Sequence, residues 1–241
     1  MSVLKDKVAV ITGASSGIGA AIATVLAKEG ARLCLVGRDG KRLNAVADEG
    51  RKHTKHITVY QADFGVDNDI YRMGVDMQDE YEAIDILIHC AGAISVGEIG
   101  LSSIETFDHQ YRINVRAPYL LTQILLPILR RCCGQVVFIN SSAGLTAKAG
   151  VGQYAATKHA LKAIADSLRE EVNADGIRVI SVYPGRTASP MQATVHSIEG
   201  KAYHPERLLQ ARDVAEVILH VLSLPRSAEV TDISIRPSMK P

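Results

Sequence analysis

Short apolar runs recur along the chain, and segments long enough for helices separate them. Most runs are near-continuous in Val, Ile and Leu, with no alternation of polar and apolar residues. This pattern is typical of parallel strands that are covered by helices on both faces. Strands that alternate with helices indicate βαβ units with right-handed crossovers. We therefore predict an α/β fold with one doubly wound, seven-stranded and mainly parallel sheet.

The predicted strands are 8–12, 32–36, 56–60, 84–90, 135–140, 178–183 and 232–236. The predicted helices are 17–29, 41–52, 67–82, 103–131, 152–174 and 211–223. Pro118 and Pro127 interrupt the long helix, so a kink or a broken end is expected there. Segment 186–210 has no clear periodicity, and since long irregular loops in compact domains commonly serve function, we predict a substrate lid. No linker rich in Gly, Ser or Pro divides the chain, which favours one domain over residues 1–241.

The composition excludes several classes of protein. Hydrophobic residues make up 47% of the 241, which is enough for a sizeable core and argues against disorder. A net charge of +1 gives no case for nucleic-acid binding, and no run of 18 apolar residues predicts a membrane span. The N-terminus leads into a strand without a secretory signal pattern, and the four cysteines show no CxxC spacing. We therefore expect a cytoplasmic protein with reduced thiols and no metal site.

A glycine-rich turn follows the first predicted strand, and a helix follows the turn. Glycines let the backbone approach a pyrophosphate, and a helix N-terminus offers free N–H groups and a positive dipole end. The alternative is an ordinary strand–helix turn without a ligand. The glycine-rich turn lies in the first predicted βαβ unit, and this position favours a nucleotide-binding site. The residues predicted to bind the cofactor here are Gly13, Ser15, Ser16, Gly17, Ile18 and Gly19.

The segment from Thr12 to Gly19 matches the TGxxxGxG motif of the short-chain dehydrogenase/reductase superfamily at every fixed position. The chain resembles the single-domain members of that superfamily, and matching motifs extend in the family's order to Thr187. The resemblance implies a Rossmann-type domain, a nicotinamide dinucleotide, and interconversion of a carbonyl compound and a secondary alcohol.

The residues after the second predicted strand bear on the choice of cofactor. A carboxylate there bonds the ribose 2′-OH of NAD, whereas a basic residue accommodates the 2′-phosphate of NADP. Gly37 takes the place of the family's acid and Arg38 follows it, so we predict that NADP(H) is preferred to NAD(H). A guanidinium can bind a phosphate through two parallel hydrogen bonds. Asp39 weakens the prediction if it neutralises Arg38, and a solvated turn arginine is the alternative.

The resemblance assigns further cofactor contacts to Asp63, Phe64, Ala91, Gly92, Pro184, Gly185 and Thr187. Asp63 is implied to accept a hydrogen bond from the adenine amino group. His89 and Cys90 stand where the family usually has two asparagines, which chiefly brace the sheet. The difference therefore puts the local stability of the sheet in doubt more than cofactor binding. We expect His89 to be a hydrogen-bonded core histidine and not a catalyst. Arg186 is either a surface arginine at the lid hinge or a contact for an acidic substrate group.

The catalytic set that the family shares is matched by Asn114, Ser141, Tyr154 and Lys158. Tyr154 and Lys158 are four residues apart, which places them one turn apart on one face of a helix. Ser141 follows the fifth predicted strand, at the edge where open α/β sheets bind ligands. Ser142 is the alternative to Ser141, because it is adjacent in the same turn.

Tyrosine, with an ordinary pKa of about 10, transfers protons poorly near neutral pH. An ammonium at roughly 4 Å, with an effective dielectric of about 20, attracts a phenolate by about 4 kcal/mol. We therefore expect Lys158 to lower the pKa of Tyr154, which acts as general acid in reduction and base in oxidation. Ser141 would donate a hydrogen bond to the carbonyl oxygen. The resemblance implies that Lys158 also holds the nicotinamide ribose and that Asn114 holds a water linking Lys158 to solvent.

Two other functions stay open at this point. One is reduction of a 3-oxoacyl thioester, within the same family. The other is a cofactor-binding regulator with little turnover, although a regulator has no need of the Tyr154–Lys158 pair.

Apolar residues between Tyr119 and Leu129 spread round much of their helix. A surface helix normally has a narrower apolar stripe, so an exposed remainder would favour association. Family members commonly pair the two helices that correspond to 103–131 and 152–174 of this chain across a two-fold axis. We therefore predict a homodimer or homotetramer, with burial under the lid or at the Pro118 kink as the alternative.

Overall fold

The computed structural model describes residues 2–239. It contains a seven-stranded sheet in which each neighbouring pair is parallel, with the order β3-β2-β1-β4-β5-β6-β7. The strands are β1 (Val8–Thr12), β2 (Arg32–Gly37), β3 (Ile57–Gln61), β4 (Ile86–His89), β5 (Gln135–Ile139), β6 (Arg178–Pro184) and β7 (Asp232–Ile235). The predicted doubly wound parallel sheet is confirmed.

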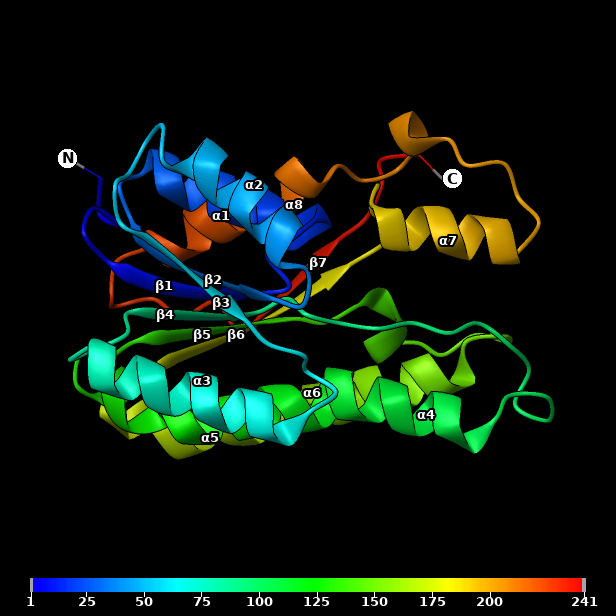
Figure 1. Cartoon of the computed structure of the whole chain (residues 1–241). Coiled ribbons are helices and arrows are strands. Elements are labelled where there is room, and N and C mark those ends of the chain that lie inside the picture. Colours follow the sequence, from blue (N-terminus) through cyan, green and yellow to red (C-terminus); the bar gives the residue numbers. More distant parts are fainter. Residues whose placement is uncertain (1, 240–241) are drawn as a thin grey trace.

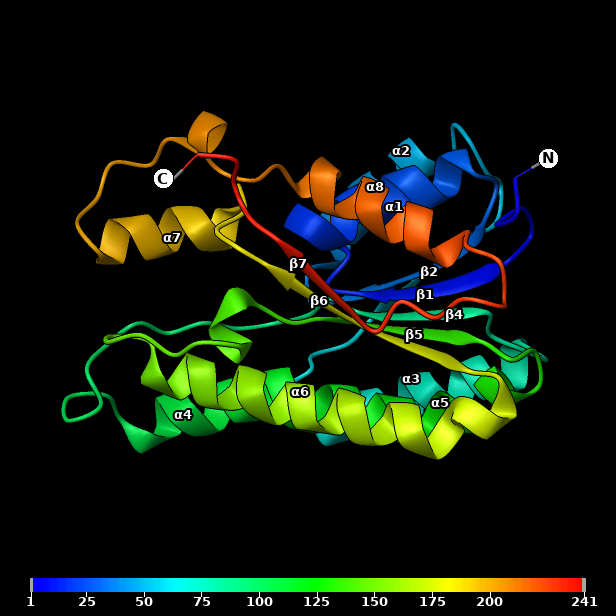
Figure 2. The same cartoon turned by 180° about the vertical axis from the view of Figure 1, so that it is seen from behind.

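Helices cover both faces of the sheet (Figures 1 and 2). One layer holds α1 (Gly17–Lys28), α2 (Gly40–Gly50) and α8 (Ala211–Leu222), and the other holds α3 (Asp67–Glu80), α4 (Ile104–Tyr111), α5 (Ala117–Arg130) and α6 (Gly152–Val172). Each layer buries its own apolar core against the sheet. The chain reverses its direction of travel across the sheet between β1 and β4, and such switch points form ligand crevices.

The predicted helix 103–131 is not continuous. A π-helical turn, Arg112–Arg116, joins α4 to α5, and Pro118 is the second residue of α5. Pro118 has no N–H to donate to the carbonyl of Asn114, four residues earlier, and this favours the wider turn. The chain stays helical through Pro127 and α5 ends at Arg130, so the break expected at Pro127 is wrong.

Segment 186–210 is more regular than we expected. It contains helix α7 (Pro190–Ile198), which lies beyond the carboxyl ends of the strands, and a short 3₁₀ turn at Pro205–Arg207 (Figure 1). Ser189 caps α7, because its side chain accepts a hydrogen bond from the N–H of Gln192 at 3.2 Å. Pro190 at the first helical position also favours a helix start. These two signals in the sequence were overlooked because apolar periodicity is weak there.

The apolar residues of α5 are mostly used within the chain itself. Of the eight that we expected to leave an exposed excess, five are buried: Leu120, Leu121, Leu125, Ile128 and Leu129. Tyr119 is 54% exposed. Leu125 is fully buried in the core against the sheet, so a charge there would damage folding and would not report on association. No helix within residues 2–239 is long and apolar enough to cross a membrane.

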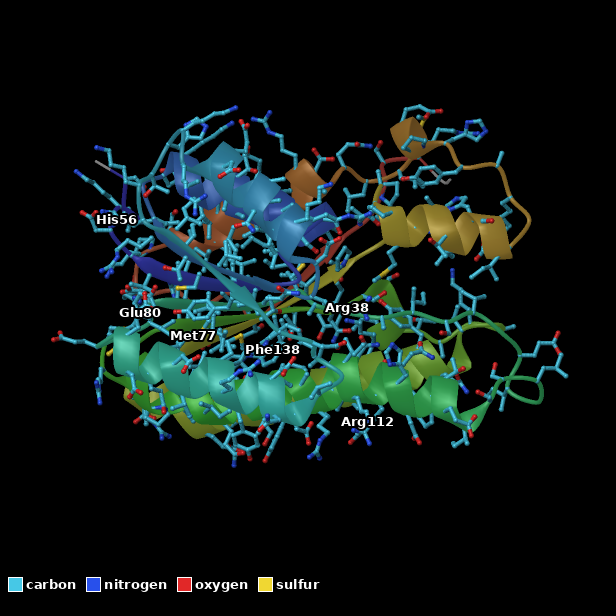
Figure 3. The ribbon with its side chains drawn as sticks, viewed as in Figure 1. Arg38, His56, Met77, Glu80, Arg112 and Phe138 are labelled. Carbon is cyan, nitrogen blue, oxygen red and sulfur yellow. The ribbon has the colours of Figure 1, made fainter. Side chains whose placement is uncertain are left out.

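His89 is a buried core residue on β4, as expected. Its Nε2 atom lies 2.8 Å from Oγ1 of Thr122, and its ring stacks on Phe138 of β5 with centroids 4.9 Å apart. Figure 3 shows Phe138 between the sheet and the helix layer that holds α3, α5 and α6. Burial lowers the pKa of His89 from 6.5 to about 3. The ring is therefore neutral in the folded protein at any pH near neutrality.

This burial predicts an acid-sensitive stability. Between pH 6.5 and about 3 the unfolded state binds a proton that folded His89 does not, so folding stability falls as pH falls through that window. At pH 5 the loss from this one group is about 2 kcal/mol. Urea unfolding of wild type and His89→Asn at pH 7.5 and pH 5 should therefore show a smaller acid loss in the variant. The exposed His53→Asn serves as control, and equal acid losses in wild type and His89→Asn would contradict the account.

Candidate active site

A cleft of about 970 Å³ lies at the carboxyl edge of the sheet. Figure 3 shows Arg38 at this edge, whereas His56 and Glu80 lie at the opposite end of the sheet. The cleft brings together most of the predicted site residues: Gly13, Ser15, Ser16, Gly17, Ile18, Arg38, Asp63, Phe64, Ala91, Gly92, Ser141, Tyr154, Lys158, Pro184, Gly185 and Thr187. Two predicted residues, Gly19 and Asn114, do not line it but lie behind lining residues.

The glycine turn needs its glycines for close packing. Gly13 and Gly17 have φ of +66° and +56°, where side chains are rarely tolerated. A Cβ on Gly19 would lie 2.4 Å from the carbonyl oxygen of Gly13, and one on Gly13 would lie 2.7 Å from the nitrogen of Ala91. Oγ1 of Thr12 accepts hydrogen bonds from the N–H groups of Cys90 (2.9 Å) and Ala91 (3.0 Å). The turn is thereby held against the end of β4.

The N-terminus of α1 is left free for a ligand. Ser16 precedes the helix without a side-chain capping bond, and no acidic residue lies in the first turn. Unbonded N–H groups and the positive end of the helix dipole therefore face the cleft, which favours an anion. These residues fit the diphosphate of a dinucleotide. No three His, Cys, Asp or Glu side chains gather for a metal ion in residues 2–239.

Arg38 remains available at the far end of the cleft. Its side chain is 74% exposed and its Nη1 lies 3.9 Å from Oδ2 of Asp63. Asp39 does not pair with Arg38: it caps α2 by accepting from the N–H of Arg42 (3.0 Å) and pairs with the Arg42 guanidinium (3.2 Å). Asp63 also accepts from the N–H of Gly65. Arg42 lines the cleft too and was missed, although its place in the first turn of a predicted helix was a signal.

Ser141 and Tyr154 are neighbours in the cleft, and the Ser141 hydroxyl lowers the pKa of Tyr154. Ser141 follows β5, and its Oγ also accepts from the N–H of Ala143 at 3.1 Å. Ser142 lies in the same turn and is exposed. The contact with Tyr154 favours Ser141 over Ser142 as the serine that acts on substrate.

Lys158 is buried with 3% of its surface exposed, and its Nζ donates to the carbonyl of Ile139 at 3.0 Å. Nζ lies 5.8 Å from the ring centroid of Tyr154. Asn140, which we missed, joins β5 to α6: its amide donates to the Lys158 carbonyl (3.1 Å), and its Oδ1 accepts from the N–H of Ser141 (2.9 Å). Asn140 thereby fixes the distance between the serine and the lysine helix.

The expected direction of the tyrosine pKa is wrong for the protein without cofactor. Burial raises the pKa of Tyr154 to about 12, and the neighbouring Ser141 hydroxyl offsets part of that rise. Burial also lowers the pKa of Lys158 to about 8. Both shifts have one cause, because an apolar surrounding disfavours the charged form of either group. Tyr154 therefore keeps its proton throughout the neutral range.

Asn114 organises the turn after β4. Its amide nitrogen donates to the Ala93 carbonyl (2.8 Å) and to Oγ1 of Thr157 (3.0 Å), and its Oδ1 accepts from the N–H of Ala93 (2.8 Å). A Cβ on Gly92 would lie 3.4 Å from Asn114 Oδ1 and 4.0 Å from Lys158 Nζ. Asn114 thus ties the turn that bears Gly92 to the helix that bears Lys158.

The segment with α7 closes one side of the cleft. A Cβ on Gly17 would lie 3.3 Å from the Cβ of Ser189, so the start of α7 lies beside the glycine turn. Ser189 was missed as a site residue. The hydroxyl of Thr187 donates to the Gly185 carbonyl at 3.0 Å. Arg186 is not a free surface arginine, because it lines the cleft and pairs with Glu199.

Comparison with known proteins agrees with this geometry. The family model described as short chain dehydrogenase matches residues 7–200. An uncharacterised oxidoreductase of Staphylococcus epidermidis is 34% identical over 238 residues, which are 98% of this chain and 100% of the relative. A solved alcohol dehydrogenase of Thermococcus sibiricus, complexed with 5-hydroxy-NADP, is 25% identical with a TM-score of 0.88 and 98% of each chain covered.

A proposed short chain dehydrogenase of Escherichia coli CFT073, complexed with NADPH, is 27% identical with a TM-score of 0.89. The match covers 97% of this chain and 98% of that one. The resemblance drawn from the motifs is therefore confirmed: the chain belongs to the short-chain dehydrogenase/reductase family and is an oxidoreductase with its Rossmann-type fold.

Proposed function

We propose that this protein is an NADP(H)-dependent oxidoreductase that interconverts a carbonyl compound and a secondary alcohol. The observation that carries the proposal is that Ser141, Tyr154 and Lys158 share one cleft with a glycine-lined, uncapped helix N-terminus. A cofactor-binding regulator would have no use for a buried lysine beside a neighbouring serine and tyrosine. In this proposal the whole chain acts as one domain, and residues 186–210 are the lid.

The cleft residues have distinct tasks toward the cofactor. The glycine turn and the start of α1 would hold the diphosphate, and Arg38 would pair with the 2′-phosphate. Lys158 and Thr187 would hold the nicotinamide ribose and amide, and Asp63 with Phe64 would border the adenine. When bound, NADPH supplies a hydride to the carbonyl carbon. The NADPH and 5-hydroxy-NADP complexes of the two solved relatives support this choice of cofactor.

Tyr154 would deliver the proton. Its raised pKa keeps the phenol protonated until negative charge develops on the substrate oxygen. Ser141 would donate a hydrogen bond to the same oxygen and so stabilise that charge. The Lys158 ammonium would then stabilise the phenolate that Tyr154 leaves, and with a pKa of about 8 it is mostly charged at pH 7. Asn114 would hold the water that returns a proton to Lys158, the role that the family resemblance implies for it.

Cofactor consumption tests the proposal directly. Purified protein with NADPH is assayed at 340 nm in the spectrophotometer against aldehydes, ketones, oxo acids and 3-oxoacyl thioesters. Oxidation of NADPH that depends on one of these carbonyls is the expected result. A protein that binds NADPH but oxidises it with none of them would be a regulator and not an enzyme.

We also keep the prediction of a homodimer or homotetramer. Light scattering should give two or four times the 26.0 kDa of one chain. Tyr119→Asp, at an exposed site on α5, should shift the mass toward one chain, since a charge opposes burial in an apolar contact. Tyr71→Asp on α3, where Tyr71 is similarly exposed, is the control. A mass of one chain at every concentration would contradict the prediction.

A further inference from the structure

Arg186 forms an ion pair inside the cleft. Its Nη2 lies 2.5 Å from Oε1 of Glu199, the residue that follows α7, and the two side chains are 33% and 16% exposed. The pair therefore joins the end of β6 to the far end of α7. Both side chains face the substrate half of the cleft, which we define by the cleft-lining residues that fall within segments 93–113, 142–151 and 191–199, together with Arg186. A carboxylate is thus already bound to Arg186 in this half.

Glu199 has a second cationic partner besides Arg186. Nζ of Lys201 lies 2.9 Å from the second carboxylate oxygen of Glu199. The hydrogen bond from Arg186, with Lys201 as a further cation, lowers the pKa of Glu199 to about 2, so it is an anion at neutral pH. If Arg186 released Glu199, Lys201 would still pair with it. Arg186 can therefore exchange Glu199 for another carboxylate without leaving either charge uncompensated, which is the main cost of breaking a partly buried pair.

The rest of the substrate half suits a molecule with an apolar body. Ile94, Leu145, Val151, Met191 and Val195 contribute its apolar walls. Besides His109, its ionisable lining residues, among those the structure describes, are Lys148, Arg186 and Glu199, which gives two cations and one acid. One further negative charge would balance this half of the cleft. Two other arginine–aspartate pairs, Arg38–Asp63 and Arg42–Asp39, lie at the other end of the cleft.

We infer that the substrate is a carbonyl compound with an apolar body and a carboxylate, and that this carboxylate replaces Glu199 on Arg186. The carbonyl part rests on the proposed function, whereas the carboxylate site stands on Arg186, Glu199 and Lys201. The exchange forms and breaks no covalent bond and moves no proton. It transfers Arg186 from one carboxylate to another and frees the far end of α7 from the end of β6.

Binding of an unreactive acid tests the site without any turnover. Calorimetry at pH 7 compares hexanoate with hexanamide, which has the same shape and no charge. Wild type should bind hexanoate more tightly. Arg186→Gln should weaken hexanoate binding at least about tenfold, the effect of losing a hydrogen bond between charged groups. Glu199→Gln should strengthen hexanoate binding, because the competing carboxylate is gone, and neither change should affect hexanamide.

Arg207→Gln is the matched control, since Arg207 is exposed in the same segment and does not line the cleft. Equal binding of the two ligands, no binding of either, or hexanoate binding that is unchanged in Arg186→Gln would overturn the inference. Arg186-dependent hexanoate binding by a protein that reduces no carbonyl would support the carboxylate site and count against the proposed function alone.

Discussion

Replacement of Tyr154 by Phe is expected to lower carbonyl reduction at least about 10²-fold while the protein stays folded and binds NADPH. The change removes only the hydroxyl beside Ser141, and the ring keeps its packing. The substrate oxygen then loses its proton donor, because the Lys158 ammonium is bonded to the Ile139 carbonyl and lies 5.8 Å from the centre of the ring at position 154. Initial rates of NADPH oxidation measure turnover, and fluorescence titration of NADPH measures cofactor binding.

The matched control is Tyr111→Phe, which deletes the same hydroxyl from an exposed tyrosine of α4 outside the cleft. It should keep turnover within about twofold, as expected of surface substitutions. A Tyr154→Phe protein that retains more than about a tenth of the wild-type rate would falsify the role of Tyr154 as proton donor. Loss of NADPH binding in Tyr154→Phe would instead show that the tyrosine is needed for the cofactor.

The five inner strands were predictable because nearly all of their residues are buried, on both faces of the sheet. Val8–Thr12 is buried at every position, and its bounds agree with the apolar run in the sequence. The positions of the site residues were predictable for a related reason. Gly13, Ser141 and Pro184 each lie at the carboxyl end of a strand, and parallel strands bring those ends to one edge.

Other parts of the site depend on contacts between distant segments. Asn140 is hydrogen-bonded to the backbone of Lys158, which is 18 residues away. Glu199 forms an ion pair with Arg186, and the whole of α7 separates the two in the sequence. Nothing local marks either residue. The direction of the Tyr154 pKa was wrong for the same reason, since spacing gives the distance to Lys158 but not the burial that both groups experience. The π-helical turn at Asn114 likewise follows from Pro118 together with bonds to Ala93 and Thr157.

Arg38→Asp is expected to weaken NADPH binding about 10²-fold and to improve binding of NADH. A guanidinium on a phosphate makes hydrogen bonds between charged groups, each worth roughly 1.5–3 kcal/mol, and the new carboxylate repels the 2′-phosphate. The same carboxylate can accept hydrogen bonds from the ribose hydroxyls of NADH. Asp39 does not dilute the effect, because it is bound to Arg42 and to the start of α2. Dissociation constants for both cofactors, from fluorescence titration, give the change in preference.

Arg72→Asp is the control with the same change in charge, because Arg72 is an exposed residue of α3 that pairs with Asp69 outside the cleft. It should leave both dissociation constants within about twofold, since exposed charges at such distances are screened by salt. Raising the salt concentration should weaken NADPH binding to wild type more than to Arg38→Asp, because only the wild type has the attraction to screen. A wild-type protein that binds NADH as tightly as NADPH would show that Arg38 does not read the 2′-phosphate. A preference for NADPH that persists unchanged in Arg38→Asp would have to come from another residue, with Arg42 the next to test.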